Sequence, residues 1–60
     1  MHFEIRRSDN GYWWRIVGGN NEIMVASEIT SRQNCINSIA RVKTSAASAP
    51  VFDDDGGRLA

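Results

Sequence analysis

The chain has 60 residues and no net charge, with seven basic and seven acidic side chains, one cysteine and one histidine. This length allows one small domain or half of a larger one, and the balanced charge gives no overall field that would draw the chain to nucleic acid or anionic lipid. One cysteine and one histidine exclude an intrachain disulfide and a Cys/His zinc cluster, and we expect no metal and no cofactor. No apolar run approaches the roughly 20 residues of a membrane span. The start Met-His-Phe-Glu is unlike a secretory signal, so we expect a cytoplasmic protein.

The first part of the chain predicts a β-hairpin. Residues 2–8 and residues 12–17 both alternate apolar with polar side chains. Asn10-Gly11 predicts a two-residue type I′ turn between them, because both residue types accept positive φ angles. This turn would place Ile5 opposite Ile16. The face predicted to point inward then holds Phe3, Ile5, Trp14 and Ile16.

The other face of this hairpin is predicted to carry mixed charge and one large aromatic ring. In the predicted register Arg6 lies opposite Arg15, which is unfavourable alone, and Glu4 lies diagonal to Arg15 and offsets part of the repulsion. The residues expected on this outward face are Glu4, Arg6, Trp13, Arg15 and Val17.

A second turn and a third strand follow the hairpin. Gly18-Gly19-Asn20-Asn21 is a sequence typical of turns. Residues 22–27 predict a strand with Ile23 and Val25 on one side and Met24 on the other.

Residues 29–43 predict the only helix. Thr30 and Gln33 fit a capping box at its start, and Ser31 is an alternative N-cap one residue later. Pro50 and the Ser/Ala residues before it make a longer helix unfavourable. The apolar stripe consists of Cys35, Ile39, Val42 and Ala46, widened by Ile36 and Ala40.

The C-terminal part predicts a short strand and a tail. Residues 50–53, Pro-Val-Phe-Asp, begin with a proline, which suits an edge strand. We expect residues 1–53 to form one unit and residues 54–60 to form a flexible acidic and Gly-containing tail. Because so short a chain has no disulfide or metal to reinforce it, we expect it to gain core by forming a homodimer.

Five short motifs occur in order along residues 3–53. They are Phe3-Glu4-Ile5, Trp14-Arg15-Ile16, Asn20-Asn21-Glu22-Ile23, Ser31-Arg32 and Cys35-x-Asn37-x-Ile39-x-x-Val42-Lys43. The set resembles the YegP-like family of small bacterial proteins, catalogued as a domain of unknown function, in its single-repeat form. The resemblance implies an α+β fold in two layers, with three antiparallel strands, one helix and a short C-terminal strand. It further implies a homodimer with one continuous sheet, in which Val51 and Phe52 of each subunit pair within the other half.

The outward face offers one functional interpretation. Trp13, Arg15 and Arg6 could form a platform on which a single-stranded nucleic acid or a small ligand stacks and makes phosphate contacts. Such platforms usually lie in a positively charged groove, and this chain is neutral. The alternative, which we favour, is that Trp13 and Arg15 cover the sheet through cross-strand packing and a cation–π contact.

Two further features could carry chemistry. Cys35 near a helix start could act as a nucleophile or redox thiol, but His2 is the only histidine and Cys35 also belongs to the apolar stripe. Asp53, Asp54 and Asp55 could ligate calcium or magnesium, but they lack the spacing of a calcium-binding loop. We therefore expect structural roles for both features. The leading hypothesis is a non-enzymatic homodimeric binding or interaction module without catalytic residues.

Overall fold

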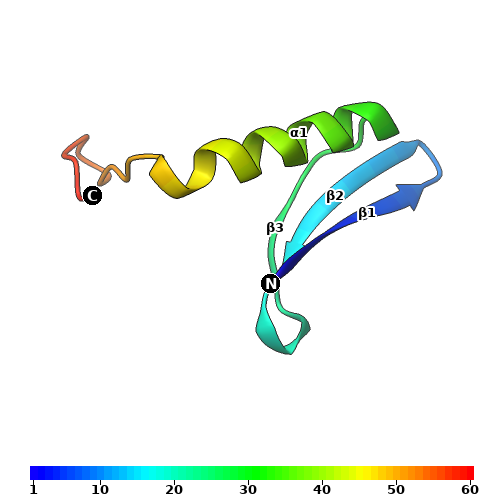
Figure 1. Cartoon of the computed structure of the whole chain (residues 1–60), viewed down its shortest axis with the longest axis horizontal. Coiled ribbons are helices and arrows are strands. Elements are labelled where there is room, and N and C mark those ends of the chain that lie inside the picture. Colours follow the sequence, from blue (N-terminus) through cyan, green and yellow to red (C-terminus); the bar gives the residue numbers. More distant parts are fainter.

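The computed structural model describes all 60 residues as an open sheet with one helix lying across it (Figure 1). The elements are β1 (His2–Ser8), β2 (Gly11–Val17), β3 (Ile23–Ala26) and α1 (Arg32–Ser45), with short 3₁₀ turns at Gly19–Asn21 and Ala46–Ser48. The three strands are antiparallel in the order β1-β2-β3. This arrangement confirms the predicted α+β combination of three antiparallel strands and one helix.

The hairpin turn differs from its prediction. Ser8 pairs with Gly11, so the turn consists of Asp9 and Asn10, and the whole register is shifted by two residues from the predicted one. The type I′ prediction is wrong, because neither turn residue has a positive φ angle. Gly11 instead has φ 144°, and a Cβ atom there would lie 2.8 Å from the carbonyl oxygen of Thr30. Glycine is therefore needed at this position for a close approach of two chain segments.

The inner face of the hairpin was predicted correctly in spite of this shift, but Val17, predicted on the outward face, is buried at the point where the pairing of β2 with β3 is irregular. A displacement of two residues leaves each side chain on the same side of a strand. The Phe3 and Trp14 rings lie 6.1 Å apart on the inner face, which α1 covers. The buried residues are Trp14, Val17 and Cys35, of which only Cys35 is fully buried.

The segment after β3 continues along β2 before the helix begins. The Ser27 amide donates to the Trp14 carbonyl at 2.8 Å, and the Ser27 Oγ accepts from the Trp14 amide at 2.9 Å. Thr30 and Tyr12 then exchange two backbone hydrogen bonds of 2.7 and 2.8 Å. These contacts bring the chain back to the hairpin turn, where α1 starts.

The helix begins at the alternative cap. Ser31 is the N-cap, and its Oγ accepts from the Asn34 amide at 3.1 Å. The predicted capping box of Thr30 and Gln33 does not form, because the Thr30 backbone is already paired with β2 and the Gln33 side chain donates to Asn37. No helix in the structure is long and apolar enough to cross a lipid bilayer.

The C-terminal segment lies beyond the far end of α1, away from the strands (Figure 1). It forms no sheet strand. Instead residues 51–60 close on themselves: Leu59 donates to the Val51 carbonyl at 2.8 Å, and Asp53 donates to the Gly57 carbonyl at 2.7 Å. The molecule is consequently elongated, with extents of 40 × 26 × 21 Å and a radius of gyration of 13.6 Å. A compact domain of this length has a radius of gyration of about 10 Å.

Candidate functional site

The outward face of the hairpin brings the predicted site residues together in a different pairing. The observed register places Glu4 directly opposite Arg15, and Arg6 opposite Trp13. The predicted opposition of two arginines is therefore wrong. Arg15 holds the Glu4 Oε1 through both Nε and Nη2, each at 2.7 Å. Its guanidinium carbon lies 5.6 Å from the centre of the Trp13 ring, which is the predicted cation–π contact.

His2 completes a small ionic network on this face. Its Nε2 lies 2.8 Å from the second carboxylate oxygen of Glu4. The hydrogen bonds from His2 and Arg15 hold the pKa of Glu4 below its ordinary value, because they stabilise the charged form. The carboxylate therefore stays ionised at neutral pH and neutralises Arg15.

This arrangement limits what the outward face can bind. A nucleic-acid platform needs an open aromatic face and free cations. Arg15 covers part of the half-buried Trp13 and is itself paired with Glu4, so Arg6 is the one exposed cation among the three predicted residues. The geometry suits a stabilised sheet surface better than a phosphate-binding groove.

Cys35 has no partner for nucleophilic chemistry. Its side chain is completely buried, and it is a free cysteine. His2 is hydrogen-bonded to Glu4 on the outward face of the sheet, whereas α1 and Cys35 lie on the inner face. The thiol is thus positioned as a small core residue.

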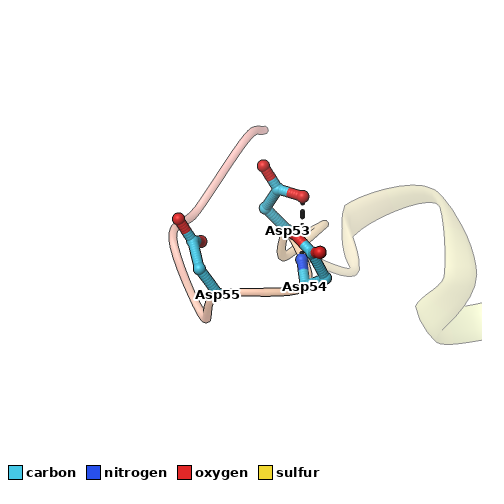
Figure 2. Close-up of side chains that lie close together, drawn as sticks. All are labelled: Asp53, Asp54 and Asp55. Carbon is cyan, nitrogen blue, oxygen red and sulfur yellow. Dashed lines mark hydrogen bonds between the residues drawn. The ribbon is translucent and has the colours of Figure 1, made fainter.

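The three C-terminal aspartates form an exposed cluster (Figure 2). One oxygen from each carboxylate lies within 4.8 Å of the others. The Asp54 amide donates to Asp53 Oδ1 at 2.8 Å, which holds the pKa of Asp53 below its ordinary value, and the Gly57 amide donates to Asp55 Oδ1 at 2.8 Å. These hydrogen bonds explain the cluster as a turn, and we assign it no metal.

A polar recess between α1 and the segment after β3 was not predicted. Its volume is about 520 Å³. Several of its polar groups already bind one another: Ser27 accepts from β2, and Thr30 Oγ1 accepts from the Asn34 side chain at 3.0 Å. No pattern in the sequence predicts this recess, since its shape depends on the pairing of Thr30 with β2. It is lined by Trp14, Ser27, Glu28, Ile29, Thr30, Asn34, Asn37, Ser38 and Arg41.

Large apolar side chains are exposed on β3 and at the C-terminal end. Ile23 and Val25 are 53% and 48% exposed, and Val51 and Phe52 are 51% and 60% exposed. A second recess, of about 390 Å³, is lined only by residues between Ser38 and Ala46, so it is a bare face of the C-terminal half of α1. β3 and the segment with Val51 and Phe52 are therefore two apolar surfaces that no other part of the chain covers.

The family of this chain follows from a comparison with known proteins. The profile of a family described as a domain of unknown function (DUF1508) matches residues 8–53, which include β2, β3, α1 and the segment with Val51 and Phe52. No curated protein and no solved structure matches the chain. This family is the YegP-like family that the sequence motifs indicated. The chain therefore belongs to the YegP-like family of domains of unknown function.

Proposed function

We propose that the protein is a cytoplasmic, non-enzymatic homodimer that serves as a small binding or interaction module, with residues 50–53 of each subunit joined to the sheet of the other. The observation that carries this proposal is the position of Val51 and Phe52. Both are exposed, and the C-terminal segment that contains them lies beyond the far end of α1, away from the strands (Figure 1). An apolar segment held out in this way gains by inserting into a second subunit.

The energetics support association. Burying a large apolar side chain contributes about 1.5–3 kcal/mol. Only three residues are buried in the single chain, while apolar side chains on β3 and near the C-terminus remain in water. A chain of this size with no disulfide often folds stably only as an oligomer.

The absence of catalytic chemistry is the second part of the proposal. The Glu4 carboxylate, the best-defined ionic group, is kept charged by His2 and Arg15 rather than poised for proton transfer. Cys35 is buried without a base. These two observations support a binding role over an enzymatic one.

Thermal unfolding at several protein concentrations tests the homodimer. When a folded dimer unfolds to two chains, the midpoint temperature rises with concentration. We expect this rise for the full chain between about 5 and 500 μM, and we expect it to disappear when residues 50–60 are removed. A midpoint that is independent of concentration in the full chain would contradict the proposal.

A second candidate function is binding of a single-stranded nucleic acid or small ligand on the outward face. It is favoured by one observation: the exposed Arg6 lies directly opposite the half-exposed Trp13. Titration with an oligonucleotide, followed by tryptophan fluorescence, separates the two candidates. The leading proposal expects no salt-dependent change. A salt-dependent quench that is lost in both Trp13→Phe and Arg6→Ala would favour the second candidate.

A further inference from the structure

We infer that Asn10 is a site of spontaneous chemical modification: its side chain closes a ring with the Gly11 nitrogen, loses ammonia and leaves aspartate or isoaspartate at the hairpin turn. The isoaspartate form then loosens the attachment of the start of α1 to the hairpin. This inference does not depend on the proposed homodimer. It is carried by the residue that follows Asn10, by the freedom of the Asn10 side chain and by the contact between Gly11 and Thr30.

Asn10 is the only asparagine of the chain that precedes a glycine. Asparagine is one of the chemically labile residues, because the backbone nitrogen of the next residue can attack its side-chain carbonyl carbon. A Cβ atom on that next residue crowds the attack, and glycine has none. The other asparagines precede larger residues, namely Asn21, Glu22, Cys35 and Ser38. Ring closure is therefore least hindered at Asn10.

The structure leaves the Asn10 side chain free to move. Asn10 is exposed in the turn, and only its backbone amide is hydrogen-bonded, to the Ser8 Oγ at 3.3 Å. The side chains of Asn34 and Asn37 are both held by hydrogen bonds in α1. An intramolecular attack requires the two reacting atoms to reach contact, so a free side chain favours it. Asn10 meets this condition and the helical asparagines do not.

The Gly11 nitrogen becomes available when the last pair of the hairpin opens. Ser8 and Gly11 form the pair next to the turn. Tyr12 directs its backbone groups to Thr30. Because these groups alternate in direction along a strand, the Gly11 nitrogen points to Ser8. A pair at the end of a ladder opens more readily than the pairs inside it, so the reaction needs only local opening.

The reaction consumes only water. The Gly11 nitrogen forms a bond to the Asn10 side-chain carbonyl carbon, and the side-chain nitrogen leaves as ammonia with the proton of the Gly11 amide. Water then adds to one of the two carbonyl carbons of the ring. Breaking the bond between the Gly11 nitrogen and the side-chain carbon gives aspartate, whereas breaking its bond to the main-chain carbon gives isoaspartate. No atom changes its oxidation state, so no oxidant or reductant is required.

Isoaspartate changes the contact that joins the hairpin to α1. The hairpin turn lies beside the start of α1 (Figure 1), where a Cβ atom on Gly11 would lie 2.8 Å from the carbonyl oxygen of Thr30. Isoaspartate adds one carbon atom to the main chain directly before Gly11. The two hydrogen bonds between Tyr12 and Thr30, of 2.8 and 2.7 Å, follow at the next residue. The longer main chain displaces Gly11 and weakens these bonds.

Mass spectrometry of the full chain tests the site. The folded protein is incubated at neutral pH in water enriched in heavy oxygen and is then digested with trypsin in ordinary water. Cleavage after Arg7 and Arg15 gives a fragment, residues 8–15, in which Asn10 is the only asparagine. We expect this fragment to exchange its amide nitrogen for one heavy oxygen, while fragments 16–32 and 33–41 and the Asn10→Gln variant, which would need a larger ring, keep their masses. An unchanged fragment 8–15, or equal change in the other fragments, would overturn the inference.

Amide hydrogen exchange tests the effect on the start of α1. The isoaspartate form is separated by chromatography and compared with the unmodified chain and with Asn10→Asp, which carries the same charge on an ordinary main chain. We expect the amides of Tyr12 and Thr30 to exchange about tenfold faster or more in the isoaspartate form alone, because weakened hydrogen bonds lower the local stability. Equal exchange in all three samples, or equally fast exchange in Asn10→Asp, would overturn the proposed loosening of α1.

Discussion

The two ends of the molecule contain similar apolar residues, but they differ in how completely those residues are covered. At the hairpin end, β1 and β2 hold Phe3 against Trp14, and the first half of α1 places Cys35 in a fully buried position. At the arm end, which comprises the last turn of α1 and residues 46–60, no residue is buried, and none is buried in β3 either. The difference lies in the number of neighbouring elements and not in residue type. The comparison shows that the hairpin end covers its apolar residues within one chain, whereas the arm end does not.

The largest expected effect is at the hairpin end. Replacement of Trp14 by alanine removes the central buried ring and should lower the free energy of unfolding by about 3–5 kcal/mol. Urea unfolding measures this loss. The matched control is Trp13→Ala on the outward face, where the ring is half-buried, and we expect less than half the loss there. Equal losses from the two variants would mean that the hairpin end has no single buried centre.

The next effect is at the arm end and should depend on protein concentration. Phe52→Ala should lower the stability of the dimer by about 1.5–3 kcal/mol per subunit and should have almost no effect on dissociated chains. Leu59→Ala is the control, because Leu59 is equally exposed near the C-terminus but lies outside residues 50–53. Thermal unfolding at low and high protein concentration separates an effect on the dimer from an effect on the single chain. A concentration-independent effect of Phe52→Ala would contradict the proposed role of the arm.

The sequence was a good guide to the elements and a poor one to their exact pairing. Alternation along β1 and β2 assigned the inner face correctly, but Asp9-Asn10 and Asn10-Gly11 both allow a two-residue turn that leaves every side chain on the same face. The hydrophobic pattern could not distinguish them. The deciding contact is the approach of Thr30 to Gly11, which joins distant parts of the chain.

The undetermined register also explains why the arrangement of the candidate site was predicted only in part. The neighbourhood of Trp13, Arg15 and Arg6 could be predicted because all three point outward from adjacent strands. The pairing of Glu4 with Arg15 could not, since it depends on the register. If a second chain covers Val51 and Phe52, as we propose, their position depends on that chain too, and local sequence carries no measure of it.

The helix cap gives a smaller effect within the hairpin end. Ser31→Ala removes the oxygen that accepts from the Asn34 amide and should cost about 1 kcal/mol. Thr30→Ala removes only a side-chain hydrogen bond at the surface and should cost less. The free energy of unfolding from urea titration compares the two. If Thr30→Ala were the more damaging change, the cap would be at Thr30 and the helix would begin one residue earlier.

The smallest effect concerns the outward ionic network. The pKa of Glu4 in the folded chain lies below its ordinary value of 4.5, so its contribution to stability is present above about pH 4.5 and is lost as the pH falls through the lower folded value. Glu4→Gln should therefore be less stable than the unchanged protein at pH 7, and the difference should disappear at low pH. Glu22→Gln, at an exposed carboxylate without an ion pair, serves as the control. A difference that persists at low pH would assign the effect to packing and not to charge.

The central claim is that the open arm end is completed by a second copy of the same chain. Sedimentation equilibrium of the full chain at micromolar concentration tests it most directly. We predict a mass of twice the 6.7 kDa of one chain. A folded species that keeps the mass of a single chain up to high micromolar concentration would contradict the claim.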